Sequence, residues 1–453
     1  MSSTAVVLFT RDLRVHDQRA LSAAANRGGT VVPLFVLDDS LWRTGTGANR
    51  RLFLRDALAD LRDSLRRLGG DLVVRRGDAV DETLRMARAT GAERILVGDD
   101  VSGYAQTRRR RLERECRRER LELVVDDTIG AVPIGDLAPA HSDHYRRFTP
   151  YWRCWRDAPS PAVLDAPARI ELPKGVPVGR LPTRAELVAD RSSPDLPTGG
   201  EAAGRRRLVR WLRDGIHEYD ARRDVLAIEG TSRLSPYFHF GCVSAREAVE
   251  RARSHGRVAD EFVRQLCWRD FFLQLLGANP ETVREDLRSW EPDWRDDDEG
   301  FARWSAGRTG MPIVDAAMRQ LRQEGWMHNR GRLVAGSLLT KMLGVDWRRG
   351  ADVFFDLLVD GDVASNVGNW QWVAGTGADT RPNRTFNPVR QAKRFDRDGA
   401  YVRRYVAELR DIEDAYVHEP WRAPRAARPA DYPAPVVDVT TMGRARSRAR
   451  GAR

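Results

Sequence analysis

The segment Ala5-Val-Val-Leu-Phe9, followed at once by the polar turn Thr10-Arg-Asp-Leu-Arg14, indicates how the chain begins to fold. Five consecutive apolar residues that give way to charges are typical of a short strand buried on both faces. The apolar run is too short, and its flanking residues are wrong, for a secretory signal peptide. The turn lacks the pattern Gly-x-Gly-x-x-Gly, which excludes a dinucleotide site of the usual kind at this position.

Four further short apolar runs follow, at Val31–Leu37, Leu72–Val74, Ile95–Val97 and Leu121–Val125. Helical patterns separate them, most clearly over 51–68 and 104–120. Buried strands that alternate with helices predict a doubly wound parallel sheet. Residues 1–128 are therefore expected to form a Rossmann-like α/β domain.

The composition then changes three times along the chain. Residues 129–200 are rich in Pro, Asp and Gly and predict a connector, with an aromatic patch at 151–155. Residues 201–425 are helical in pattern throughout, so we expect an all-α domain there. Residues 426–453 are rich in Pro, Ala and Arg and predict a disordered tail.

The overall charge is basic. The chain has 453 residues, with 76 Lys and Arg against 65 Asp and Glu, a net charge of +11 and 13 Trp. Only three of the basic residues are Lys. Arg and Trp suit phosphate contacts and base stacking, although a GC-rich coding sequence would also favour Arg over Lys. Residues 301–350 hold nine basic and three acidic residues, which places much of the charge in the helical region.

Several protein classes can be set aside. The chain has no run of 18 apolar residues, so we expect no membrane span. The four cysteines show neither Cys-x-x-Cys nor zinc-ligand spacing, and the histidines show no His-Glu-x-x-His. We therefore expect reduced thiols, no metal site and a cytoplasmic location.

Five segments of the helical region combine residues that can hold a charged or aromatic ligand. They are Gly230-Thr-Ser-Arg-Leu-Ser-Pro236, Gln265-Leu-Cys-Trp-Arg269, Trp326-Met-His-Asn-Arg-Gly-Arg332, Asp360-Gly-Asp362 and Asn366-Val-Gly-Asn-Trp-Gln-Trp372. Hydroxyls before a helix can donate to phosphate oxygens, and paired carboxylates can hold an Arg or a ring N–H. Each segment alone also fits a simpler interpretation, as helix caps or as core Trp beside surface Arg.

The spacing within the last segment adds one geometrical prediction. Trp370 and Trp372 are two residues apart, which is about 200° on a helix of 3.6 residues per turn. They should therefore face different surroundings, one a cofactor or a neighbouring helix and the other a separate cavity.

Together these segments, with the opening turn and the run Pro312-Ile-Val-Asp-Ala-Ala-Met-Arg319, resemble the DNA photolyase/cryptochrome family over almost the whole chain. The similarity is greatest to class I cyclobutane pyrimidine dimer photolyases. It implies an antenna domain, a connector and a helical domain that binds FAD and DNA. It also implies a light-dependent lyase in which excited reduced FAD passes an electron to a pyrimidine dimer flipped out of ultraviolet-damaged DNA.

The resemblance assigns roles to individual residues. The FAD-binding residues would be Tyr219, Thr231, Ser232, Arg233, Leu234, Ser235, Arg269, Asn329, Arg332, Asp360, Gly361 and Asp362. Asn366 would face the flavin N5 atom, and an electron-transfer chain would consist of Trp304, Trp347 and Trp370. The lesion and its DNA would contact Gln265, Trp268, Asn329, Arg330, Leu333 and Trp372.

Three positions depart from the usual pattern or bear on the lesion. Gln265 stands where many cyclobutane-dimer photolyases have Glu, and (6-4) photolyases favour Gln there. Asn329 stands where (6-4) enzymes have a His, and Leu333 replaces a Met of similar volume. Two alternatives therefore stay open, a (6-4) photoproduct photolyase and a cryptochrome photoreceptor without repair. Asn366 and a tail of only about 28 residues are typical of photolyases rather than cryptochromes.

A second chromophore is expected in the N-terminal domain. Phe35, Asp38, Arg51 and Asp100 are similar to the residues of the 8-hydroxy-5-deazaflavin type of antenna. Methenyltetrahydrofolate is the alternative, but the His and Glu of that type are missing from the matching regions. The partner expected from the resemblance is damaged DNA, bound by a monomer.

Overall fold

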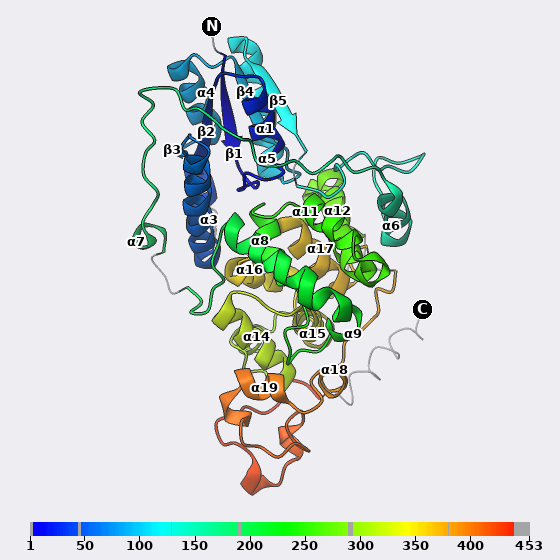
Figure 1. Ribbon diagram of the computed structural model, residues 1–453. Helices are drawn as coiled ribbons and strands as arrows, with labels where there is room; N and C mark the ends of the chain where they lie inside the picture. The colour runs from blue at the N-terminus through cyan, green and yellow to red at the C-terminus, as the bar shows by residue number, and fades with distance from the viewer. Residues whose placement is uncertain are drawn as a thin grey trace.

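The computed structural model describes residues 3–43, 47–127, 129–188, 192–288, 293–378 and 380–438. Its first part is a five-stranded parallel sheet in the order β3-β2-β1-β4-β5 (Figure 1). The strands are β1 Thr4–Phe9, β2 Thr30–Asp38, β3 Val73–Gly77, β4 Arg94–Gly98 and β5 Glu122–Asp126. The doubly wound parallel sheet predicted from the five apolar runs is confirmed.

Helices cover both faces of this sheet. One face packs against α1 (Arg19–Asn26) and α3 (Ala48–Arg67), and the other against α4 (Ala79–Thr90) and α5 (Gly103–Glu119). A short helix, α2 (Asp39–Arg43), follows β2. Because alternate side chains of a strand point to opposite faces, Val7 and Phe9 join one core while Val6 and Leu8 join the other. This explains why β1 is apolar throughout.

The connector crosses the outside of the N-terminal domain between two short helices, α6 (Phe148–Asp157) and α7 (Arg184–Leu187) (Figure 1). Among the described residues after β5, every regular element is helical. The longer helices are α8 Glu201–Arg210, α11 Ala245–Arg253, α12 Asp260–Ala278, α13 Asp298–Ser305, α14 Pro312–Glu324, α15 Asn329–Ser337, α16 Trp347–Leu357, α17 Val363–Ala374 and α18 Pro388–Phe395. Shorter ones are α9 Tyr219–Arg222, α10 Ser235–His239 and α19 Ala400–Tyr405.

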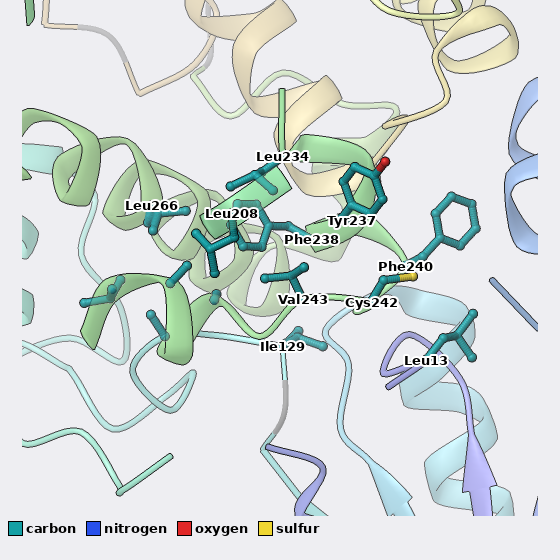
Figure 2. Packing of buried hydrophobic residues seen from close by; sticks show 14 of the residues in the cluster. Leu13, Ile129, Leu208, Leu234, Tyr237, Phe238, Phe240, Cys242, Val243 and Leu266 are labelled. Carbon is teal, nitrogen blue, oxygen red and sulfur yellow. The ribbon is translucent and has the colours of Figure 1, made fainter. Parts of the chain in front are cut away.

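A single apolar core runs from the sheet through the connector into the helical domain. Phe53 of α3 stacks on Phe240, with ring centroids 4.8 Å apart. Figure 2 shows Leu13, from the turn after β1, beside Phe240 and Cys242, with Ile129 of the connector close by. The backbone N–H of Leu13 donates to the carbonyl of Phe240 at 3.2 Å. The two domains are therefore packed together rather than loosely linked.

The first part of the C-terminal tail is ordered. Tyr432 is buried and its hydroxyl donates to Asp315 at 2.7 Å, while the N–H of Val436 donates to the carbonyl of Thr309 at 2.8 Å. Residues 426–438 therefore have defined contacts with α14 and the segment before it, in contrast to the disorder expected from their composition. Residues 439–453, with most of the tail's arginines, lie outside the described residues.

Two structural features are absent from the described residues, a membrane-spanning helix and a group of metal-ligating side chains. No helix within the described ranges is long and apolar enough to cross a bilayer. In the same ranges, no group of three His, Cys, Asp or Glu side chains is placed to hold a metal ion.

Candidate functional site

The two carboxylates of Asp360-Gly361-Asp362 lie immediately before α17 and have different partners. Asp360 accepts from the Arg332 guanidinium of α15 at 2.8 Å and its side chain is almost fully buried. Asp362 caps α17 by accepting the N–H of Ser365 at 2.8 Å, and it pairs with Arg11 of the N-terminal domain at 2.5 Å. Burial opposes the charge, but Arg11 holds the pKa of Asp362 well below its usual range. The motif therefore has both roles that its sequence allowed. Asp362 caps a helix, and each of the two carboxylates pairs with an Arg.

Arg50 packs closely against Gly361, the residue between these carboxylates. A Cβ built on it would lie 2.4 Å from an Arg50 guanidinium nitrogen. Arg50 comes from α3 and donates to the carbonyl of Leu358 at 3.2 Å. The N-terminal domain therefore contacts this turn at two points, through Arg11 and Arg50.

Further polar groups gather around Asp362. Arg269 of α12 donates to the carbonyls of Ile129 and Phe238, the latter at 3.3 Å. The Nδ1 atom of His239 lies 4.0 Å from Asp362, is buried, and finds no hydrogen-bond partner among the described residues. Burial lowers the pKa of His239 well below its ordinary value, so the ring is neutral. A buried polar atom of this kind calls for a ligand or a water, and this observation fits a bound polar cofactor.

The turn before α10 carries the predicted phosphate ligands. Thr231 and Ser232 are half-buried and Ser235 is exposed, which leaves their hydroxyls accessible. Gly230 is required because a Cβ there would lie 2.4 Å from the carbonyl oxygen of Arg222. Leu234 is buried in the core.

The Arg233 side chain does not extend into this turn. It has φ of +48°, it pairs with Glu324 at 2.7 Å and Glu229 at 2.8 Å, and it lies 4.2 Å from the Trp326 ring centroid. Its guanidinium therefore anchors the turn to α14. The donors left for an anion are hydroxyls and backbone N–H groups, which suit a phosphate.

Three other predicted cofactor residues have distinct surroundings. Tyr219 is buried edge-on to Trp211, with ring centroids 5.3 Å apart. Asn366 is half-buried on α17, and its amide donates to the carbonyl of Ala351 on α16 at 3.0 Å. Asn329 is exposed at the start of α15.

The three predicted electron-transfer tryptophans are all buried. Trp370 meets Trp304 edge-on with centroids 5.9 Å apart. Trp370 also packs over Gly350, where a Cβ would lie 2.3 Å from its ring, one turn along α16 from Trp347. The indole N–H of Trp347 donates to Asp286 at 2.8 Å. Trp347 is thus connected to Trp370 through α16, but the three rings lack an exposed member.

Trp294 is a fourth tryptophan near these three and is more accessible than any of them. It is half-buried and packs against the same core as Trp304, Trp347 and Trp370. The neighbouring Arg295 N–H donates to the carbonyl of Gly344 at 2.8 Å, three residues before Trp347. Sequence reasoning missed Trp294 because it lies in an irregular acidic segment without periodicity, although two Trp four residues apart, Trp290 and Trp294, were a usable signal there.

The two predicted lesion-stacking tryptophans are both half-buried, on α12 and α17. Trp268 stacks on Phe148 of the connector, and Trp372 lies 5.2 Å from the Arg384 guanidinium. Gln265, one turn before Trp268, donates to Glu261 at 3.2 Å. The helices α12 and α17 pack against each other, so the sequence-distant pair shares one part of the molecule.

Arg330 and Leu333 are less available than expected. Arg330 pairs with Asp224 at 2.6 Å and lies 4.3 Å from the Phe395 ring centroid. Leu333 is half-buried against the helical core. Contact of Arg330 with DNA would therefore compete with its internal ion pair.

The four predicted antenna residues do not share one cavity. Arg51 lines a cleft of about 320 Å³, with Leu37, Val74, Arg75, Arg76, Arg180, Pro182, Glu186 and Leu187. Asp38 accepts from Tyr104 and Ser40, each at 2.6 Å. Asp100 pairs with Arg11 at 3.2 Å, and Phe35 is buried in the sheet core. Only Arg51 faces this cleft, whose side chains include four Arg and one Glu.

Known proteins resemble this chain in both of its domains. Residues 5–169 match the family described as DNA photolyase, and residues 262–451 match the FAD binding domain of DNA photolyase. A deoxyribodipyrimidine photo-lyase of Streptomyces griseus is 49% identical over 454 residues, which is 99% of each chain.

Two solved structures are similar over nearly their whole length. A bacterial class III photolyase from Agrobacterium tumefaciens has a TM-score of 0.91 at 33% identity and covers 100% of this chain and 98% of its own. A Synechocystis cryptochrome has the same TM-score at 28% identity and covers 98% of this chain and 99% of its own. The shared fold therefore does not separate repair from light sensing.

Proposed function

The chain belongs to the DNA photolyase family, and on this premise we propose that it repairs cyclobutane pyrimidine dimers in DNA, using FAD and light. The observation that carries the proposal is the placement of residues on α12 and α17. The start of α17 holds the ion-paired Asp362, while Trp268 and Trp372 leave aromatic surface accessible on the same two packed helices. A cofactor held at Asp362 and a flipped-out dimer stacked on the tryptophans would therefore both lie against this pair of helices.

FAD fits the donors of this region. Thr231, Ser232 and Ser235 would bind its phosphates, together with backbone N–H groups of the turn that Arg233 anchors. The remaining contacts would come from Tyr219, Leu234, Arg269, Asn329, Arg332, Asp360, Gly361, Asp362 and Asn366. When bound in its reduced form and excited by light, FAD supplies the electron that opens the cyclobutane ring and takes it back.

The protein's own residues would bind and orient the lesion. A dimer cannot reach a buried cofactor from inside the duplex, so it must be flipped out, which costs less for a damaged base pair. Trp268 and Trp372 would stack on the flipped bases, each worth about 1–3 kcal/mol. Gln265 would hydrogen-bond the pyrimidine edge, as donor and acceptor but without the charge of a Glu. Leu333 would contribute apolar contact.

A row of indole rings would connect the cofactor site with the surface. Trp370 lies one turn after Asn366 on α17, and Trp304 and Trp347 contact the same region of the core. We assign the end of the row nearest the surface to Trp294, because it is half-buried whereas Trp304, Trp347 and Trp370 are buried.

The Arg-lined cleft at Arg51 would hold the second chromophore. Its apolar residues suit a flat ring system, and its arginines suit hydroxyl or anionic substituents. These features favour the deazaflavin type over the folate type on chemical grounds. Phe35, Asp38 and Asp100 would then support the walls rather than contact the chromophore.

One experiment separates cyclobutane-dimer repair from (6-4) repair and from photoreception. The reduced, FAD-loaded protein is mixed with duplexes that carry either lesion, illuminated near 380 nm as the family resemblance suggests, and assayed for lesion loss. We expect loss of the cyclobutane dimer only, and none in the dark. Loss of only the (6-4) product would reassign Gln265 to that class, and loss of neither would favour the cryptochrome alternative.

A further inference from the structure

We propose that Phe148, a residue of the inter-domain connector, positions Trp268 and forms the back wall of the lesion pocket. This inference rests on the proposed function, because it concerns how the same pocket binds its substrate. It makes the connector part of the substrate site rather than a passive link between the domains.

The two rings are in full contact. Their centroids are 3.6 Å apart and their planes differ by 5°. Phe148 is 6% exposed, whereas Trp268 is half-buried. Phe148 therefore covers one face of the indole, and a flipped-out base can stack only on surface that this contact leaves free.

Phe148 is held in place by the same helix that carries Trp268. Asp270, two residues after Trp268 on α12, accepts the indole N–H of Trp155 at 2.9 Å and the backbone N–H groups of Ala131 and Val132 at 2.9 and 3.2 Å. Tyr151 packs on Phe271, with ring centroids 5.6 Å apart. The connector is thus docked in a defined register on α12, which makes Phe148 a wall rather than a movable gate.

A cation extends the stack on the connector side. The Arg264 guanidinium carbon lies 5.6 Å from the Phe148 ring centroid, and Arg264 is one turn before Trp268. Phe148 is therefore contacted by two side chains of one helix face. An indole held in this way loses little rotamer freedom when a base stacks on it, so more of the stacking energy appears as affinity.

The test compares three variants of the FAD-loaded protein. Phe148→Leu removes the stack, Phe148→Tyr keeps it, and Tyr151→Leu removes another buried aromatic residue from the same helix, α6. Each is measured for its affinity for a duplex with one cyclobutane dimer, for the undamaged duplex and for thermal unfolding. Phe148→Leu should weaken dimer binding about threefold to tenfold, the size of one aromatic pair. Affinity for undamaged DNA should not change, and Phe148→Tyr should restore dimer binding.

The remaining outcomes are also decisive. In a Trp268→Ala background, Phe148→Leu should have no further effect, because the ring it positions is gone. An equal loss in Tyr151→Leu would assign the effect to connector docking and overturn the proposal, as would unchanged dimer affinity in Phe148→Leu. A wild-type protein that does not distinguish the two duplexes would instead contradict the proposed function itself.

Discussion

At the scale of single residues, the role of a charged side chain in the candidate site depends more on which residue it pairs with than on its amino-acid type. Asp360 and Asp362 are separated by one residue, yet one binds Arg332 within the helical domain and the other binds Arg11 across the domain boundary. Arg233 and Arg330 were expected at a phosphate and at DNA, but both are engaged by carboxylates. Their roles depend on contacts that only folding creates.

His328 gives the protein a pH-dependent stability. It is 3% exposed, and its Nδ1 atom caps α15 by accepting the N–H of Arg330 at 3.1 Å, which requires a neutral ring. Burial lowers its pKa to about 4. The unfolded chain therefore binds a proton that the folded one does not as pH falls from about 6.5 towards 4, and stability is lost over that window, on the order of 3 kcal/mol.

We expect His328→Asn to reduce this loss, since Asn caps a helix without titrating. Urea unfolding at pH 7, 6 and 5 measures it, with the exposed His141→Asn as control. A variant as acid-sensitive as the wild type would show that other groups, such as His239, account for the whole effect.

The row of tryptophans leads to a second prediction at this scale. Trp370→Phe should abolish light-driven reduction of the bound flavin, because a phenyl ring is far harder to oxidise than an indole. The chemically reduced variant should still repair DNA. Trp294→Phe should slow photoreduction as well, whereas Trp421→Phe, in the same core but outside the row, should not. Flavin absorbance during illumination measures all three, and normal photoreduction in Trp370→Phe would exclude its role.

Individual helices combine several roles through their periodicity. On α17, Asn366 and Trp370 are four residues apart and share a face, while Trp372 is about 200° from Trp370. Trp370 is buried and Trp372 is half-buried, and both pack against the same core. Likewise α12 holds Trp268 and, through Asp270, the connector.

Asp270 links α12 to the connector through several hydrogen bonds. It is fully buried and one of its oxygens accepts three N–H groups. Asp270→Ala should lower the free energy of unfolding by about 3–5 kcal/mol, because buried donors lose their acceptor. Asp270→Asn keeps an acceptor oxygen and should lose less.

Urea unfolding measures these losses. Trypsin probes docking directly, because Arg146 and Arg147 precede the docked helix α6 while Arg153 and Arg156 lie within it. Faster cleavage in Asp270→Ala than in Asp270→Asn is expected. Equal and slow cleavage in both would show that apolar contacts alone hold the connector.

At the scale of the whole molecule, the switch point of the parallel sheet contacts the helical domain. In doubly wound sheets, ligands bind outside the strand ends where the strand order reverses, here between β1 and β4. Arg11 follows β1 and Asp100 follows β4, and Arg11 bridges Asp100 to Asp362. The position that binds a dinucleotide in other sheets here clamps the candidate cofactor site.

Arg11→Met tests this clamp. It would leave Asp100 and Asp362 as buried, unpaired carboxylates, so we expect a loss of about 3–5 kcal/mol in unfolding free energy and weaker flavin retention on gel filtration. Arg27→Met is the matched control, because the Arg27–Glu122 pair at 3.5 Å is exposed. It should cost less than about 1 kcal/mol. Similar stability of the two variants would mean that the domains are held by their apolar core alone.

Much of the secondary structure and the domain order could be predicted from the sequence. The five strands follow from five apolar runs, and the helical character beyond residue 200 follows from periodicity, because both depend on neighbours along the chain. Disorder was expected for residues 426–438, but Tyr432 contacts Asp315, 117 positions away, and Val436 contacts Thr309. The antenna residues Asp38 and Asp100 were predicted together, and their partners, Tyr104 for Asp38 and Arg11 for Asp100, could not be predicted from sequence because they are remote in the chain.

The sequence by itself therefore determined the two fold classes, the family and the helix faces on which candidate residues lie, since periodicity and motif order are local properties. Only the tertiary structure decided which charged groups remain available, that Trp294 packs half-buried against the core that holds the three buried indoles, and that Phe148 covers Trp268. These depend on contacts between residues that are close in space and far apart in the chain, such as Arg11 and Asp362. No local sequence pattern predicts such contacts, because the residues next to each partner in the chain are compatible with many different tertiary partners.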